Sequence, residues 1–566
     1  MLWFRRDLRL DDHPALVDAC RRGPVLPLFI LDPDLLLHPE TAPARVAFLL
    51  ASLKALDHDL RRRGSRLLVR RGEPATVLTA VVRQFGAAGV VAHIDSERLV
   101  GRVRDARVQR SLAAAGIPLR WLEPPGGCSA LLAYPAYRRF WHDQMALGPI
   151  PAPSRIPTPA PPAAQEGDGT PAAEPLPGLA ELGLNGDGKP IPTAGTAAAL
   201  ERLRQFCAGG AAERYFWQLG QPAARVTTGL GPYLKFGAIS HRRVLHAITE
   251  LHRGSDGERR SWRQLVSRLR WGAGMAQRFR YLPQLELRPL WQCYGDTTLS
   301  PEQEELYAAW QSGHTGFPLV DAASRCLLAG GGWLDLNFRS RAIHASFLTN
   351  LCGIDWRYGA LHYMRHLIDG DCCIDHYQWA MQAGVTAAGG GSGGGWSRIY
   401  HPGRVAVDRC DPQGVFIRRW LPELASLTND QLGQPPAMAS YPRPLIDYET
   451  ARRRCLDRLA EQRRHWRPLG FSTLPADLSP FGADRIEGAV VDWARQQTPQ
   501  LFPAALPLEQ LDPPALRDLA SWFGPSRSLD RRSTREPARR RQRRTARRDP
   551  GAIQLELWGQ PSDTTA

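Results

Sequence analysis

The sequence predicts an α/β domain joined to a larger all-α domain, and three observations support this expectation. The chain has 566 residues, more than a single core usually organises. Over residues 1–130 short apolar runs alternate with helical patterns, whereas residues 200–475 carry long amphipathic helical patterns without strand alternation. A stretch rich in Pro, Ala and Gly separates the two regions and indicates a linker.

The first region has the element order of a parallel sheet. Four short apolar segments read as buried strands: "LWF", "GPVLPLFIL", "SRLLVRR" and "GVVAHI". Between two of them, "RVAFLLASLKALDHDLRRRG" has helical apolar spacing and ends at a glycine. Strands that alternate with helices predict a parallel, Rossmann-like sheet.

The remaining boundaries follow from composition. We expect an α/β domain over 1–130, a Pro/Ala-rich linker over 131–199, a helical domain over 200–475, a short helical extension over 476–526, and an Arg-rich disordered tail over 527–566.

The formal net charge of +16 favours a polyanionic partner. Eleven arginines lie between Arg527 and Arg548, and nucleic acid is the favoured partner; an acidic membrane surface and a merely solvated tail are the alternatives. The start "MLWFRRDLRL" lacks the apolar core of a signal peptide, and no stretch reaches the roughly 20 apolar residues of a membrane span. Ten scattered cysteines without a C-x-x-C pair add to the expectation of a soluble, cytoplasmic protein.

The run "DGDCCIDHYQW" could form a metal site, a redox thiol pair or the wall of a pocket. Adjacent helical side chains diverge by about 100°, so Cys372 and Cys373 cannot easily bind one metal together. Buried packing thiols are the favoured reading, with redox thiols and a metal as the alternatives.

Two other segments carry candidate binding groups. The loop "VTTGLGPYLKFG" offers hydroxyls and backbone N–H groups to phosphate oxygens, or it is an ordinary capped helix start. Arg341 and Asp369 form a plausible ion pair, either buried or solvated, because a buried arginine requires a carboxylate partner.

Several motifs, in order along the chain, resemble those of the DNA photolyase/cryptochrome family. They are "LWFRRDLRLDDHPAL", "TTGLGPYLKFGAIS", "TGFPLVDAASRCL", "IDWRYGALHYMRHLIDGD" and "GVFIRRWLPELASL". The resemblance covers about residues 1–470. It implies an N-terminal antenna domain and a helical catalytic domain that binds FAD.

The resemblance places a group of residues around the FAD. They are Tyr215, Thr227, Thr228, Gly229, Leu230, Gly231, Arg341, Asp369, Gly370, Asp371 and Asp375. Gly229 stands where the family often has Arg, and Gly231 where it often has Ser. Asp375 matches a position that faces the flavin ring and is often Asn; an ionised carboxylate there would disfavour an anionic reduced flavin.

For DNA, the resemblance implies that Trp271 and Trp379 stack on a flipped photolesion, with Arg339 and Arg268 nearby. Arg268 stands where the family commonly has Glu. Gly272 and Ala342 are further departures, so the identity of the lesion stays open.

The residues that would pass electrons to the flavin also differ from those common in the family. Trp356 matches one position of the family's tryptophan relay, and Tyr377 matches the flavin-proximal position. The outer position falls near Leu299–Ser300, where no tryptophan stands. The segment "ERLVGRVRD" is closer to relatives with a deazaflavin antenna than to those with a folate, and an empty antenna site is the other alternative.

The predicted function is light-driven repair of UV-damaged DNA by a lyase of the deoxyribodipyrimidine photolyase type, acting as a nucleoid-associated monomer. The alternative is a blue-light sensory flavoprotein of the cryptochrome type. A terminal segment, "QLELW", resembles the short peptide with which bacterial repair proteins bind the polymerase sliding clamp, and a random or frayed chain end is the alternative. Its contact residues would be Gln554, Leu555, Leu557 and Trp558.

Overall fold

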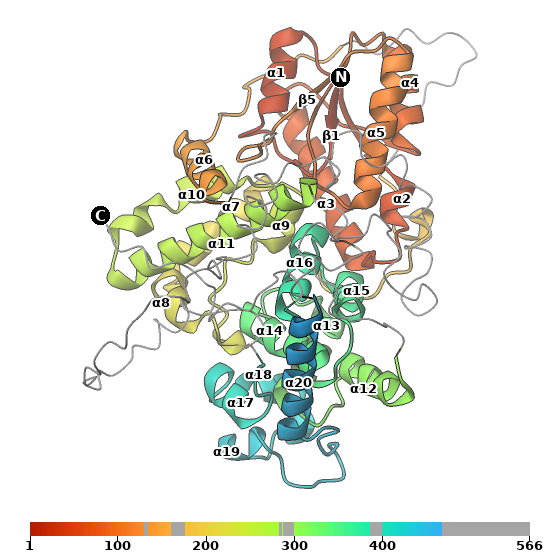
Figure 1. The fold of residues 1–566 in the computed structure, drawn as a ribbon. Coiled ribbons are helices and arrows are strands. Elements are labelled where there is room, and N and C mark those ends of the chain that lie inside the picture. The colour runs from red at the N-terminus through yellow and green to blue at the C-terminus, as the bar shows by residue number, and fades with distance from the viewer. Residues whose placement is uncertain (129–133, 160–175, 282–285, 287–298, 385–398, 467–566) are drawn as a thin grey trace, which may run out of the picture.

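The computed structural model describes residues 1–128, 134–159, 176–281, 286, 299–384 and 399–466, and Figure 1 shows their arrangement. An α/β domain lies at one end of the molecule, and helices form the rest. The predicted fold class is therefore confirmed. The extension over 476–526 and the tail over 527–566 lie outside the described residues.

The α/β domain is built on a five-stranded parallel sheet with the order β3-β2-β1-β4-β5. Its strands are β1 Leu2–Phe4, β2 Pro27–Leu31, β3 Leu68–Arg71, β4 Val90–His93 and β5 Leu119–Leu122. All four predicted strands are present. They read as continuous apolar runs because both faces of a parallel sheet are covered.

Helices cover both faces of this sheet. Leu2 and Phe4 pack with residues of α1 Pro14–Arg22 and α3 Pro43–Arg61. Trp3 points to the opposite face and packs with residues of α4 Pro74–Phe85 and α5 Leu99–Ala114. The period-two alternation of side chains along a strand separates these two cores.

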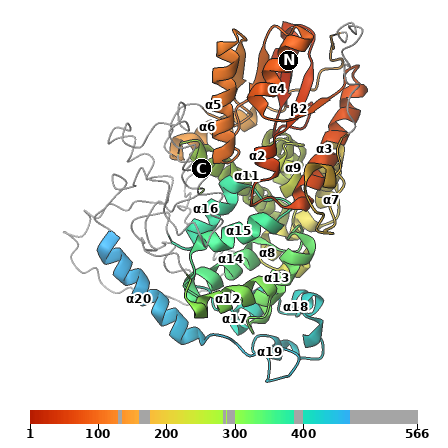
Figure 2. The same ribbon diagram turned by 90° about the vertical axis from the view of Figure 1, so that its right-hand side faces the viewer.

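The helical domain surrounds a second core. Helices that build it are α11 Asp256–Tyr281, α13 Pro318–Gly330, α14 Phe338–Ser346, α15 Trp356–His366, α16 Cys372–Gln382 and α20 Tyr448–Trp466. A single π-helical turn, η5 Phe347–Leu351, continues α14. Figure 2 shows α20 along the edge of this domain, where Arg458 donates a hydrogen bond to the carbonyl of Thr349.

Further helices and turns complete the fold. They are α2 Pro33–Leu36, α6 Tyr134–Ala146, α7 Thr196–Ala208, α8 Ala211–Gln218, α9 Gly231–Lys235, α10 His241–Ala247, α12 Pro301–Ser312, α17 Arg404–Cys410, α18 Val415–Trp420 and α19 Asn429–Leu432, with 3-10 turns η1 Ala180–Leu182, η2 Pro222–Ala224, η3 Thr249–Arg253 and η7 Pro422–Leu424. Among the described helices, none is long and apolar enough to cross a membrane.

The range predicted as a linker, 131–199, is partly folded. It contains α6, whose Tyr137 and Trp141 are fully buried. The prediction missed this helix because the neighbouring prolines and alanines dominate the composition of the range. The division into domains otherwise stays a prediction.

Candidate functional site

A cavity of about 610 Å³ lies between the sheet and the helical domain. The loops after β1 and β4 form one side of it, at the carboxyl edge of the sheet, and α9, α11, α14 and α16 form the other. This edge is where open α/β sheets commonly bind ligands.

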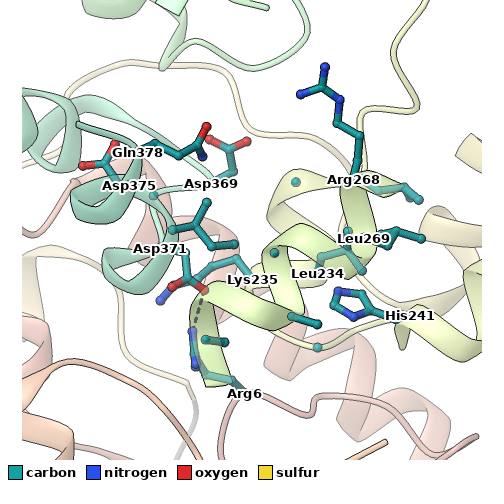
Figure 3. A pocket seen from close by; sticks show the side chains of 18 of the residues that line it. Arg6, Leu234, Lys235, His241, Arg268, Leu269, Asp369, Asp371, Asp375 and Gln378 are labelled. Carbon is teal, nitrogen blue, oxygen red and sulfur yellow. Dashed lines mark hydrogen bonds and ion pairs between the residues drawn. The ribbon is translucent and has the colours of Figure 1, made fainter. Parts of the chain in front are cut away.

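Most of the predicted site residues line this cavity. They are Tyr215, Thr227, Thr228, Gly229, Leu230, Gly231, Arg268, Arg341, Asp369, Gly370, Asp371, Asp375 and Trp379. Figure 3 shows Asp369, Asp371, Asp375 and Gln378 on one side and Arg268 and His241 on the other. Trp271, Arg339, Trp356 and Tyr377 are not among the lining residues.

The two unusual glycines have a steric explanation. A Cβ at Gly231 would lie 2.2 Å from Oδ2 of Asp369, so a side chain at 231 requires the Asp369 carboxylate to shift. Gly229 has a φ of +67°, and its Cβ would lie 2.7 Å from the guanidinium of Arg202. Arg202, which the sequence analysis missed, therefore brings a cation to the place of the arginine that is common in the family.

The predicted Arg341–Asp369 pair is present. The distance between Nη2 of Arg341 and Oδ1 of Asp369 is 3.5 Å, and the two side chains are 31% and 18% exposed. Nε of Arg341 also donates to the carbonyl of Leu336 at 3.0 Å. The pair is thus partly buried, and both of its charged groups border the cavity.

Asp371 has a partner that the sequence analysis missed. Its Oδ2 lies 2.7 Å from Nη1 of Arg6, in the loop after β1 (Figure 3), while its Oδ1 accepts from the N–H of Cys373 and caps α16. Arg6 also pairs with Asp95 and Glu97. One carboxylate therefore joins the α/β domain to the helix that carries Asp375 and Trp379.

Asp375 is a buried acid in the cavity wall. Burial raises its pKa to about 7, and among the described residues its Oδ2 has no hydrogen-bond partner. Nδ1 of His376 lies 3.7 Å from that oxygen. On the far side of the ring, Nε2 of His376 lies 3.2 Å from Glu40 of the α/β domain. Near neutral pH the carboxyl group thus carries its proton for much of the time, which limits the repulsion expected for an anionic ligand.

Trp379 forms an aromatic part of the wall, on α16. The side chain is 3% exposed, and its ring meets that of Tyr363 edge to face with centroids 5.0 Å apart. A Cβ at Gly359 would lie 2.2 Å from Cζ3 of Trp379, so α15 holds the ring only because residue 359 lacks a side chain.

Of the other predicted DNA contacts, Arg268 lines the cavity, whereas Trp271 and Arg339 are not among its lining residues. Trp271 is half-buried and packs against the helical core. Arg268 and Arg339 both lie over the ring of Phe338, at 4.2 and 5.0 Å. Arg339 also donates to the hydroxyl of Tyr400.

The predicted relay residues are both buried. Trp356 is fully buried and meets His376 edge to face, with centroids 6.0 Å apart. Tyr377 is 3% exposed. Tyr377 is not among the residues that line the cavity, and its place next to a flavin stays a prediction.

Cys372 and Cys373 are buried thiols. Sγ of Cys373 donates to the carbonyl of Ser96, and burial raises the pKa of both thiols well above their usual value. A protonated, buried thiol is a poor metal ligand and a poor nucleophile, which agrees with a packing role.

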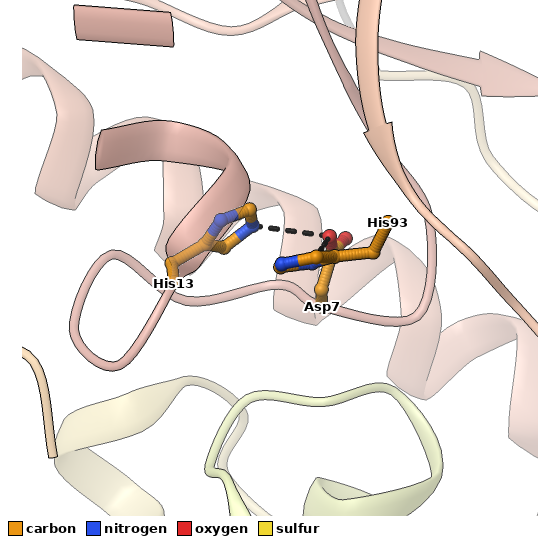
Figure 4. A group of neighbouring side chains, drawn as sticks. All are labelled: Asp7, His13 and His93. Atoms are coloured by element: carbon orange, nitrogen blue, oxygen red, sulfur yellow. Dashed lines mark hydrogen bonds and ion pairs between the residues drawn. The ribbon is translucent and has the colours of Figure 1, made fainter. Parts of the chain in front are cut away.

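A further cluster beside the cavity, the Asp7 cluster, consists of Asp7, His13 and His93 (Figure 4). Oδ2 of Asp7 lies 3.0 Å from Nε2 of His13 and 2.7 Å from Nδ1 of His93. The other nitrogen of each ring accepts a backbone N–H, from Leu16 and Ala15 respectively.

These contacts determine which nitrogen of each histidine in the Asp7 cluster carries the proton. Each imidazole must carry its proton on the nitrogen that faces Asp7. Although burial opposes ionisation, the histidines hold the pKa of Asp7 well below its usual value, and burial lowers the pKa of His13 to about 4. The two rings and the carboxylate thus hold one another and the start of α1 in place, which gives the cluster a structural role.

Comparison with known proteins agrees with this architecture. A family model for the FAD binding domain of DNA photolyase matches residues 265–461, and one for DNA photolyase matches residues 1–127. A deoxyribodipyrimidine photo-lyase from Synechococcus sp. is 34% identical over 79% of this chain and 93% of the relative. A cryptochrome DASH from Gloeobacter violaceus is 32% identical over 80% and 90%, respectively.

A solved photolyase structure also resembles the fold of this chain. The class III photolyase from Agrobacterium tumefaciens superposes with a TM-score of 0.68 at 26% identity, over 82% of this chain and 97% of that one. The chain therefore belongs to the DNA photolyase/cryptochrome family.

Proposed function

We propose that this protein is a light-dependent DNA repair flavoenzyme that splits UV-induced pyrimidine photoproducts. The observation that carries the proposal is the cavity, which brings the residues predicted to hold FAD together with the ring of Trp379 in one wall. The relatives named deoxyribodipyrimidine photo-lyase support it.

The residues present fit FAD. The glycines at 229 and 231 leave space against Arg202 and Asp369 that a Cβ would fill, and Nε of Arg202 is buried without a hydrogen-bond partner among the described residues. Thr227 and Thr228 offer hydroxyls to phosphate oxygens. When bound, FAD supplies light absorption and one-electron chemistry.

The protein's own residues would bind and orient both ligands. Arg341 and Asp369 border the cavity with opposite charges, and Asp375 presents a carboxyl group that can donate a hydrogen bond when protonated. Trp379 offers a flat apolar face against which an extruded base can stack, for about 1–3 kcal/mol per base. Arg268 and Arg339 add positive charge close to the same region, which favours DNA phosphates.

Photoreactivation in cells tests this function. Bacteria that lack their own photolyase would express the chain, receive UV and then be kept in blue light or in darkness. We expect greater survival in blue light only. Equal survival under both conditions, with FAD-loaded protein present in the cells, would contradict repair.

The second candidate is blue-light sensing without repair. The observation that favours it is the departure at the relay, where Tyr377 lies off the cavity wall, together with the cryptochrome DASH among the relatives. Dimer-containing DNA distinguishes the two candidates, because a sensor has no need to bind it better than undamaged DNA.

We also propose that the terminal segment around Gln554, Leu555, Leu557 and Trp558 binds the sliding clamp. The segment lies outside the described residues, so the argument rests on its sequence: apolar anchors follow an arginine-rich stretch, and a tether of this kind orders only on binding. A peptide spanning 551–561 is titrated against the clamp of the same organism. Binding that Leu557→Ala with Trp558→Ala abolishes supports the proposal, and equal binding by both peptides contradicts it.

An antenna chromophore of the deazaflavin type stays part of the proposal. The absorption and fluorescence of chromophores released from purified protein distinguish deazaflavin, folate and FAD alone.

A further inference from the structure

Tyr363 of α15 lines the cavity and is hydrogen-bonded to a histidine behind the wall. The distance between its hydroxyl oxygen and Nδ1 of His344 is 2.9 Å. Nε2 of His344 lies 2.7 Å from Oγ of Ser324, whose own proton goes to the carbonyl of Trp310 at 2.5 Å.

This chain of contacts fixes the position of each proton. Ser324 uses its proton on the Trp310 carbonyl, so its oxygen accepts the Nε2 proton of His344. Nδ1 of His344 is then the acceptor, and Tyr363 donates to it. A buried tyrosine on the cavity wall thus has a neutral imidazole in place to receive its phenolic proton.

Burial keeps this arrangement in one protonation state at rest. The side chains of Tyr363, His344 and Ser324 are 2%, 0% and 0% exposed. Burial lowers the pKa of His344 to about 3 and raises that of Tyr363. At neutral pH the phenol therefore keeps its proton, and the imidazole stays neutral until the tyrosine loses an electron.

Aromatic rings lead from this pair toward the surface. Trp310 is stacked on His344, with centroids 4.3 Å apart and planes inclined by 18°. Tyr307 is stacked on Trp310 at 5.9 Å and 15°, and it is only half-buried. Tyr363 and Trp379 form the cavity end of the same column, since Trp379 also meets Trp310, with centroids 6.0 Å apart.

We infer that Tyr363 is a redox-active residue that reduces light-excited, oxidised FAD, with His344 as the acceptor of its proton. The inference rests on the proposed binding of FAD in this cavity. One electron leaves the phenol ring for the flavin, the O–H bond breaks, and the proton forms an N–H bond at Nδ1 of His344. The products on the protein are a neutral tyrosyl radical and an imidazolium, which return to the resting state when an external thiol reductant supplies one electron through Tyr307 and Trp310.

Tyr363 meets two requirements for an electron donor to a ligand in this cavity. A tyrosine loses an electron readily only when its proton can leave at the same time. Tyr363 has its acceptor at hydrogen-bond distance and lines the cavity, whereas Tyr377 is absent from the wall.

Electron paramagnetic resonance under illumination tests the inference. The full-length, FAD-loaded protein is frozen during blue-light illumination without added thiol, with ordinary and with ring-deuterated tyrosine. We expect a radical signal that narrows on deuteration, is lost in Tyr363→Phe and is at least tenfold weaker in His344→Gln. Tyr363→Phe keeps the ring packing, so the variant should fold.

Tyr233→Phe is the matched control. Tyr233 is also buried and donates one hydrogen bond, to the carbonyl of Thr193 at 2.7 Å, but it does not line the cavity. Its variant should keep the signal. A signal that persists in Tyr363→Phe, or that is unchanged in His344→Gln, overturns the inference. The same preparations are assayed for dimer repair after chemical reduction, and repair there with no tyrosyl signal would refute the redox role alone.

Discussion

Gly359→Ala should displace Trp379 without touching the cavity directly. The new Cβ would lie 2.2, 2.3 and 2.8 Å from three carbons of the Trp379 ring, far inside van der Waals contact, so the ring has to move. Overpacking of this kind costs about 1–3 kcal/mol, and the gain in helix propensity from Gly to Ala returns up to about 1 kcal/mol. We expect a net loss of unfolding free energy of about 0–3 kcal/mol.

Binding of damaged DNA should respond more strongly than stability. If Trp379 stacks on the lesion, its displacement removes about 1–3 kcal/mol, which is a roughly 5- to 150-fold loss of affinity. Fluorescence anisotropy with a duplex carrying one thymine dimer, and with the undamaged duplex, measures this difference. Affinity for undamaged DNA should hardly change.

Gly272→Ala provides the control for this experiment. Gly272 lines the cavity on α11, and its Cβ would meet only Cδ1 of Ile374 at an ordinary 3.5 Å. This variant should bind the dimer as the unchanged protein does. If Gly359→Ala also binds the dimer with unchanged affinity, the position of the Trp379 ring does not determine lesion recognition.

Three further predictions concern stability. Asp371→Ala should lower the free energy of unfolding by about 1 kcal/mol more than Asp371→Asn, because Asn still caps α16 although both variants lose the charge paired with Arg6; equal denaturation midpoints would remove the capping role. The raised pKa of Asp375 means that the folded chain holds a proton which the unfolded chain has released between about pH 4 and pH 7, so stability should fall as the pH rises through this interval. The denaturation midpoint of Asp375→Asn, relative to that of the unchanged protein, should therefore rise from pH 5 to pH 8. A difference between the two midpoints that stays constant would contradict the raised pKa of Asp375. Dialysis against a chelator should leave the thermal midpoint unchanged, since one nitrogen of each ring in the Asp7 cluster accepts a backbone N–H and the other faces Asp7; a lower midpoint that zinc restores would show a metal there.

The strands and most of the cavity wall could be predicted from the sequence, for different reasons. Apolar runs such as "GPVLPLFIL" report burial on both faces of a parallel sheet, which is a local property. The residues predicted to hold FAD, most of which line the cavity, come from the family resemblance, whose motifs lie in continuous segments. Position along a motif then carries over directly to position around the cavity.

Contacts between distant segments could not be predicted in this way. Arg6 and Asp371 are 365 positions apart, and their ion pair depends on how the sheet docks against α16. Arg202 stands beside Gly229 because α7 packs there, and the sequence shows only a missing arginine at 229. The hydrogen bond between His344 and Tyr363 joins α14 to α15, and helical periodicity indicates only that both positions face inward.

The most direct test of the proposed repair function is a single-turnover assay. The FAD-loaded protein is chemically reduced, mixed with a stoichiometric oligonucleotide that carries one thymine dimer, and exposed to blue light or kept dark. We expect restored thymines in the light only, measured by chromatography, with the flavin absorption spectrum the same before and after because the reaction has no net redox change. Unaltered dimers after illumination, in protein that holds reduced FAD and binds the damaged oligonucleotide, would contradict it.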